Sequence, residues 1–113
     1  MSPRIVLIAR REKDLQDGQP DYSIWAGEQR VGRIYRKHRR GDRELWFWGI
    51  NSVTSDMTVG DPMQGLDAAS FEDARARLRV AFDHWLAWAL AIPRGDMKYE
   101  RLSTELKKMG AVR

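Results

Sequence analysis

The run from Ser70 to Ile92 most constrains the fold, because it has the pattern of one long amphipathic helix. Its apolar residues recur at steps of three and four, which places them in one stripe: Phe71, Ala74, Leu78, Phe82, Trp85, Ala89 and Ile92. Ser70 is a good N-cap with Asp73 three residues later, and Pro93 ends the run. Such a stripe is typical of packing on a hydrophobic core, so the rest of the chain must supply a matching surface.

Most of the chain before this helix has the pattern of strands and turns. We expect strands over 4–9, 22–26, 29–37 and 44–52, with turns at Gly27-Glu28 and at residues 39–42. Short turns between neighbours favour an antiparallel meander of the last three, whereas the partner of the first is open. The predicted fold class is therefore α+β, with an antiparallel sheet of three to four strands packed on the helix 70–92.

The strand at 44–52 is apolar on both of its faces. Alternation directs Leu45, Phe47 and Gly49 to one side of the sheet. The other side receives Trp46, Trp48 and Ile50. A small sheet packed on one helix normally has a polar second face that is exposed to water. Because both faces are apolar here, something must cover the second face. The C-terminal segment, another chain and a ligand all remain open.

Two further segments complete the expected layout. Residues 53–67 are polar and carry Gly60, Pro62 and Gly65, so we expect a long loop, with a short edge strand at 53–59 as the alternative. A second helix is expected over 97–109, capped by Asp96 and ended by Gly110. Its narrow apolar stripe suits docking on the second face of the sheet or pairing with a copy of itself: Tyr99, Leu102, Leu106 and Met109.

The size and composition point to one domain over residues 1–113 in the cytoplasm. A chain of 113 residues without cysteine has no disulfide and suits a reducing compartment. The start of the chain lacks the cleavage pattern of a signal peptide, and no apolar run is long enough to span a membrane.

No pattern of an enzyme is present in the sequence. The two histidines stand in no recognisable Ser/His/carboxylate arrangement, and they are too few for a metal site without cysteine. The glycine-rich phosphate loops are also missing. We therefore expect a protein that is not an enzyme and has no cofactor, no metal and no membrane partner.

The basic charge is concentrated in one segment. Seven of the cations and a single acid, Asp42, fall between Arg30 and Arg43, although the net charge of the whole chain is only +4. Cations beside aromatic residues suit the phosphates and bases of a single strand, and a basic β-ribbon can alternatively enter the major groove of a duplex. The hypothesis is that a basic hairpin contacts nucleic acid through these residues: Arg33, Arg36, Lys37, Arg39, Arg40 and Arg43, with Tyr35, Trp46 or Trp48 stacking if exposed.

A second interpretation gives the same cations no role in nucleic-acid binding. Arg and Lys can simply solvate an edge hairpin and discourage aggregation, while the tryptophans form core. The protein would then be a protein–protein interaction or oligomerisation module that uses the second face of the sheet. Self-association as a dimer is compatible with either interpretation.

Two segments carry a resemblance to known proteins. W-F-W-G-I at 46–50 and S-F-E-D-A-R-A at 70–76 resemble the strand and helix of short bacterial proteins with no assigned activity. The meander followed by a helix is also similar in plan to the AP2-type and integrase arm-type DNA-binding domains, in which the sheet reads DNA and the helix backs it. The loop before the helix is longer here than in those domains, so no base-reading residue is carried over.

Overall fold

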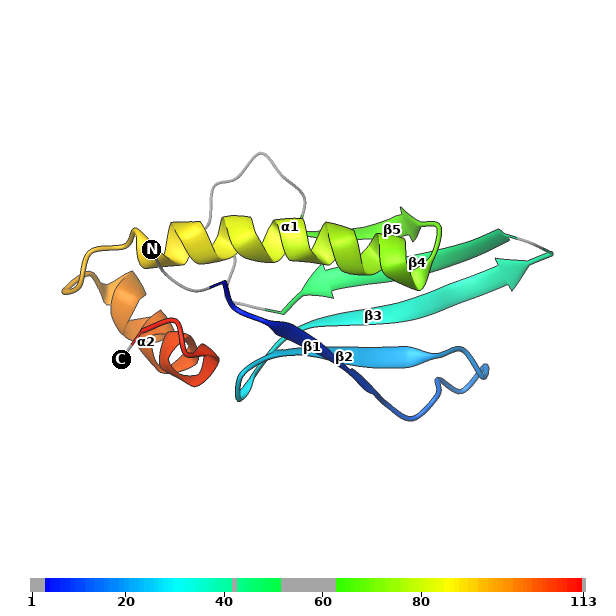
Figure 1. Ribbon diagram of the computed structural model, residues 1–113, viewed down its shortest axis with the longest axis horizontal. Helices are drawn as coiled ribbons and strands as arrows, with labels where there is room; N and C mark the ends of the chain where they lie inside the picture. The colour runs from blue at the N-terminus through cyan, green and yellow to red at the C-terminus, as the bar shows by residue number, and fades with distance from the viewer. Residues whose placement is uncertain (1–3, 42, 52–62, 113) are drawn as a thin grey trace.

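The computed structural model describes residues 4–41, 43–51 and 63–112, which form one antiparallel sheet and two helices. The sheet has five strands in the order β1-β2-β3-β4-β5, each beside its neighbour in the chain. The bounds are β1 Leu7–Arg11, β2 Asp21–Ala26, β3 Gln29–Arg40, β4 Arg43–Ile50, β5 Gln64–Ala68, α1 Phe71–Leu90 and α2 Met97–Met109. Figure 1 shows α1 running along one face of the sheet, with α2 at its end. The predicted α+β class and antiparallel meander are confirmed.

The sheet has five strands, against the three to four that we expected. Residues 64–67 of the predicted loop 53–67 form most of β5, which pairs with β4. The sequence QGLDA has little intrinsic preference for a strand, so this strand depends on the backbone groups that β4 offers at its edge. The alternative strand at 53–59 lies outside the described residues. The first strand begins at Leu7 rather than Arg4 and pairs with β2.

Both helices begin as the sequence predicts and α2 also ends as predicted, whereas α1 ends at Leu90, two residues before the expected Ile92. The Ser70 side chain accepts a hydrogen bond from the Asp73 N–H at 3.0 Å, and the Asp96 side chain accepts one from the Lys98 N–H at 2.8 Å. Gly110 ends α2 with a φ of +79°, the left-handed conformation that glycine adopts without penalty. None of the described helices is long and apolar enough to cross a membrane.

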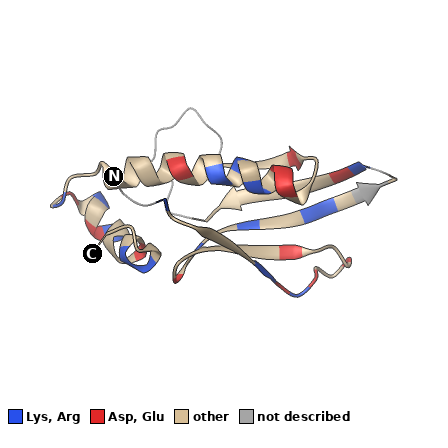
Figure 2. Cartoon of the chain, viewed as in Figure 1, with Lys and Arg blue, Asp and Glu red and all other residues tan. Residues whose placement is uncertain are grey.

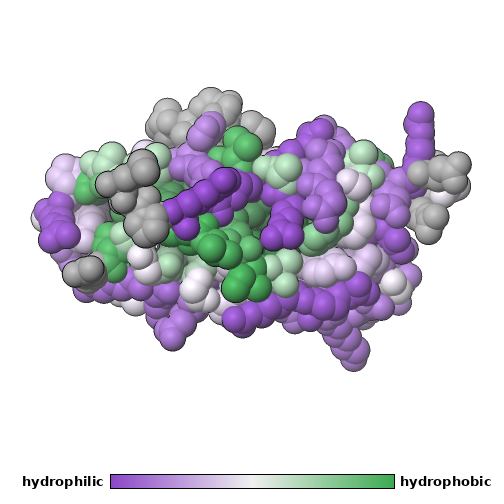
Figure 3. Space-filling model, in the orientation of Figure 1, coloured by the Kyte–Doolittle hydropathy of each residue, from purple (hydrophilic) through white to green (hydrophobic). Residues whose placement is uncertain are grey.

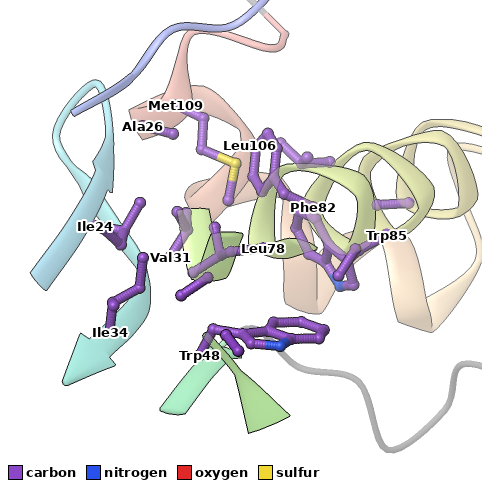
Figure 4. Close-up of a cluster of buried hydrophobic side chains, with 14 of the residues drawn as sticks. Ile24, Ala26, Val31, Ile34, Trp48, Leu78, Phe82, Trp85, Leu106 and Met109 are labelled. Carbon is purple, nitrogen blue, oxygen red and sulfur yellow. The ribbon is translucent and has the colours of Figure 1, made fainter. Parts of the chain in front are cut away.

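The core lies between α1 and one face of the sheet (Figure 4). Trp46 and Trp48 point to this face, where only 5% and 4% of their surfaces are exposed. From α1, Leu78, Phe82 and Trp85 meet them, and each of these is almost wholly buried. We call this side the helix face and the other the open face.

The position of α2 differs from our expectation. Leu102, Leu106 and Met109 are buried in the same core as α1, so α2 does not cover the open face. At its C-terminal end, α2 is attached to the β2–β3 turn, where the Glu28 N–H donates to the Lys108 carbonyl at 3.0 Å. A stripe as narrow as that of α2 fits a corner of a core as well as a flat sheet, which is why the pattern could not choose between them.

Gly27 makes this attachment possible, and replacing it by alanine is expected to loosen α2. Gly27 has a φ of +59°, and a Cβ there would lie 2.6 Å from the Lys108 carbonyl oxygen. The left-handed backbone and the clash together should lower the free energy of unfolding by about 2–4 kcal/mol. Gly18→Ala is the matched control, because its φ is +82° and a Cβ there meets nothing within 4 Å.

Urea denaturation of the two variants, with amide exchange along α2, separates the backbone penalty from the lost contact. The Gly18 variant should lose only about 1–2 kcal/mol, as expected of the left-handed backbone alone. Equal losses, with unchanged exchange protection in α2, would show that the close approach of Gly27 to α2 contributes nothing.

Candidate nucleic-acid interface

The hairpin of β3 and β4 extends beyond the rest of the sheet (Figure 1). β2 pairs with β3 only as far as Tyr35, and β5 pairs with β4 only from Trp46 onward. Residues 37–41 and 43–45 therefore form a two-stranded projection, which we call the β3–β4 ribbon. Gly41, at a φ of +57°, begins the turn at its tip, as the sequence predicts, but Arg39 and Arg40 belong to β3 and not to the turn.

A bulge lies where the β3–β4 ribbon leaves the sheet. Arg36 pairs with Trp46 and His38 pairs with Leu45, so Lys37 is an extra residue without an opposite neighbour. Bulges bend a strand and increase its twist, so the ribbon is turned relative to the sheet behind it.

Two of the predicted ribbon cations are well exposed. The side chains of Lys37 and Arg43 face solvent, and within the described part of the chain neither has an ion-pair partner. Figure 2 shows positive charge along β3 and at the start of β4. Arg39 and Arg40 stand in β3 opposite Glu44 and Arg43, but their side chains lie outside the described residues. The ribbon thus holds four of the six predicted phosphate contacts.

Arg36 is held by internal contacts instead. Its Nη1 lies 3.4 Å from Glu44 Oε1, and its Nε donates to Gln19 Oε1 at 2.6 Å. Glu44 also accepts a hydrogen bond from Trp46 Nε1 at 2.8 Å. Arg36 therefore braces the base of the ribbon on the helix face, and a phosphate could bind it only by replacing these partners.

Arg33 lies on the open face and is also paired. Its Nε and Nη2 donate to the two carboxylate oxygens of Asp21 at 3.0 and 3.3 Å. This hydrogen bonding raises the pKa of Arg33, against the opposing effect of partial burial. A guanidinium stays charged at any pH at which proteins fold, so the consequence is a largely neutral pair and not a free cation.

The aromatic residues are not arranged as the stacking hypothesis requires. Trp46 and Trp48 were to stack on bases if exposed, and that condition is not met, because both are buried beneath α1. Tyr35 is on the open face and half-buried, with its ring stacked on Phe47 at 4.8 Å and the Arg33 guanidinium 4.6 Å from its centroid. Of the three predicted stacking residues, only Tyr35 is accessible.

Sequence reasoning missed a second aromatic and cationic pair on the open face. The Arg10 guanidinium lies 4.4 Å from the centre of the Trp25 ring. Trp25 Nε1 donates to Ser23 Oγ at 2.8 Å, and Ser23 in turn donates to Glu12 at 2.5 Å. The expected first strand ended at residue 9, so Arg10 fell outside it; the alternation of LIARR on an edge strand was the signal that could have found it.

On the open face, guanidinium groups already contact the aromatic rings. On the ribbon, exposed cations have no ion-pair partner among the described residues. The first arrangement leaves few ring faces for incoming bases, whereas the second suits phosphates. Among the described residues, no group of three or more His, Asp or Glu could hold a metal ion. No family model, curated protein or solved structure matches the chain.

Proposed function

We propose that this protein is a non-enzymatic nucleic-acid-binding protein, and that the β3–β4 ribbon enters the major groove of duplex DNA. The observation that carries the proposal is a two-stranded segment that projects beyond the strands that flank it. It bears two exposed cations, Lys37 and Arg43, which have no ion-pair partner among the described residues. A major groove about 12 Å wide admits a two-stranded β-ribbon. The proposed setting is the cytoplasm.

A duplex is the better target because the chain lacks an open stacking platform among its described residues. Binding of a single strand needs exposed aromatic faces as well as cations. Trp46 and Trp48 are buried, and the rings of Trp25 and Tyr35 already carry guanidinium groups. Cations on a narrow ribbon can contact the two phosphate backbones that border a groove without any aromatic side chain.

The experiment is fluorescence anisotropy with labelled DNA duplex, DNA single strand and RNA duplex of one sequence, from low to physiological salt. We expect the DNA duplex to bind most tightly, because the major groove of A-form RNA is too deep and narrow for side chains to read. The logarithm of the binding constant should fall with log salt with a slope of about −4, the value for four to five phosphate contacts.

Either of two results would overturn this proposal. Absence of binding to all three probes at low salt would remove nucleic acid as the ligand. Tighter binding to the single strand than to the duplex would move the interface from the ribbon to the Trp25 and Tyr35 side of the sheet.

The second candidate function is a protein–protein interaction or oligomerisation module without a nucleic-acid role. The observation in its favour is an unpaired edge strand, β1, beside an apolar groove. That surface lies apart from the ribbon, so the two functions are compatible. Light scattering of the purified protein would detect self-association directly.

A further inference from the structure

β1 is an edge strand whose outer side carries free backbone groups. The Glu12 N–H donates to the Asp21 carbonyl at 2.9 Å, directed toward β2. Hydrogen-bonded and non-hydrogen-bonded pairs alternate in an antiparallel ladder, so Ile8 and Arg10 also bond toward β2. Leu7, Ala9 and Arg11 consequently direct their N–H and C=O groups outward, and in the described chain no backbone group bonds to them there.

An apolar groove of about 470 Å³ runs between β1 and α1. α1 packs mainly on β3, β4 and β5, which leaves the helix face of β1 and β2 partly uncovered beside it. The floor of the groove is formed by apolar side chains from the sheet and from α1: Ile5, Leu7, Ala9, Ile24 and Leu78. Figure 3 shows hydrophobic side chains gathered in this region, with hydrophilic ones around them.

The rim of the groove is predominantly positive. Arg4, Arg75 and Arg79 border it, against one acid, Glu72. Arg79 is occupied, since it bonds to Asp83 and donates to the Ile5 carbonyl at 2.5 Å. Arg75 is exposed and has no ion-pair partner in the part of the chain that the structure describes. Arg4 lies 3.8 Å from Asp83, so Arg75 is the available cation of the rim. Arg10 adds an exposed cation on the open face of β1, and the edge is therefore complementary to a ligand that is apolar on one side and acidic on the other.

We propose that the outer edge of β1 binds an extended segment of a partner protein that alternates apolar and acidic residues. The segment adds to the sheet as a sixth strand, with main-chain hydrogen bonds to Leu7, Ala9 and Arg11. Because side chains alternate along a strand, the apolar residues enter the groove and the acidic residues lie on the open face, beside Arg10.

Charge argues against a second copy of this chain as the occupant. An edge formed by two β1 strands would bring together two sets of Arg4, Arg10 and Arg11. Arg4 and Arg11 are paired with Asp83 and Asp14, at 3.8 and 2.7 Å. Arg10 has no ion-pair partner among the described residues, so its charge would be unopposed in both copies. An acidic partner removes this repulsion and replaces it with attraction.

The test uses the full chain and a fluorescein-labelled peptide of eight residues that alternates valine with aspartate. Two control peptides are used. The block peptide has the same composition with all aspartates in one block, and the lysine peptide has lysine in place of each aspartate. We expect micromolar binding of the alternating peptide, at least about tenfold weaker binding of the block peptide, and none of the lysine peptide. Equal binding of the alternating and block peptides would reduce the interaction to general attraction of charge and overturn the proposal.

Ala9→Pro removes one outward N–H while the bonds from β1 to β2 remain, because proline is tolerated on the free side of an edge strand. We expect the alternating peptide to bind this variant at least about tenfold more weakly, since the ring also obstructs an incoming strand. Arg10→Glu should weaken binding as well, whereas Arg94→Glu, an exposed site away from the groove, should not. Circular dichroism verifies the fold of each variant.

Unchanged peptide affinity in both the Ala9 and Arg10 variants would overturn the proposal. A dimer in light scattering that dissociates in the Ala9 variant would instead assign the edge to a second copy. Neither outcome depends on the ribbon, so this inference and nucleic-acid binding can fail separately.

Discussion

Replacing Phe82 by alanine is expected to lower the free energy of unfolding by about 3–5 kcal/mol. The Phe82 side chain has no exposed surface and lies at the centre of the core, facing Trp48 from α1 (Figure 4). Removal of the ring loses its burial and leaves a cavity that the neighbours Trp85 and Leu78 cannot fill without moving. Because small proteins are stable by only about 5–15 kcal/mol, the variant should be close to unfolding at physiological temperature.

The matched control for this prediction is Val80→Ala, two residues away on the same helix. Val80 is 55% exposed, so its truncation should change stability by less than about 0.5 kcal/mol. Urea denaturation followed by tryptophan fluorescence measures both variants. A loss below about 1 kcal/mol for Phe82→Ala would contradict the placement of α1 on the Trp46 and Trp48 side of the sheet.

The parts of the fold that local chemistry determines were predictable from the sequence. Both helices have a stripe, a capping side chain and a breaker within a few residues, and none of these signals depends on the rest of the chain. The same holds for the turns at Gly27 and Gly41, where a positive φ requires glycine. The alternation of WFWG along β4 also separated its two faces correctly, although it could not say which of them meets α1.

The parts that depend on partners distant in the chain were not predictable. β5 is a strand because β4 presents unpaired groups to it, and its own residues do not indicate this. Strict alternation along β3 would place Val31 on the same face as Arg33 and Tyr35, but the register shift beside it leaves it without a partner in β2 and buried. One inserted residue reverses the alternation locally, and no propensity reveals where an insertion will occur.

The sequence predicted which cations lie in the hairpin, but it did not predict which of them are available to a ligand and which are paired within the protein. The charge run located the hairpin correctly, since Lys37 and Arg43 are exposed in its projecting part and have no ion-pair partner within the described part of the chain. The charge run could not separate these two cations from Arg33 and Arg36, which are paired. Their partners come from other segments of the chain: Asp21, Gln19 and Glu44. A sequence records that a cation exists, whereas its availability depends on which acids the fold brings beside it.

Reversing three ribbon charges together, Lys37→Glu/Arg40→Glu/Arg43→Glu, is expected to weaken binding of duplex DNA by about a hundredfold or more at moderate salt. Each change removes a phosphate contact and adds a repulsive charge, so the salt slope should become shallower by about 3. Arg36 is left in place because it braces Glu44 at the base of the ribbon. The variant should therefore keep its stability, since the ribbon lies outside the core.

The matched control is Lys13→Glu/Arg94→Glu/Lys98→Glu, which changes the net charge by the same amount at three exposed positions outside the ribbon. Anisotropy titrations of both variants across salt concentrations distinguish a local interface from general attraction to a basic protein. If the control weakens binding as much as the ribbon variant, the DNA responds to net charge alone. If only the ribbon variant fails, the binding energy depends on where the cations stand, and only a projecting strand pair presents them at the width of a groove.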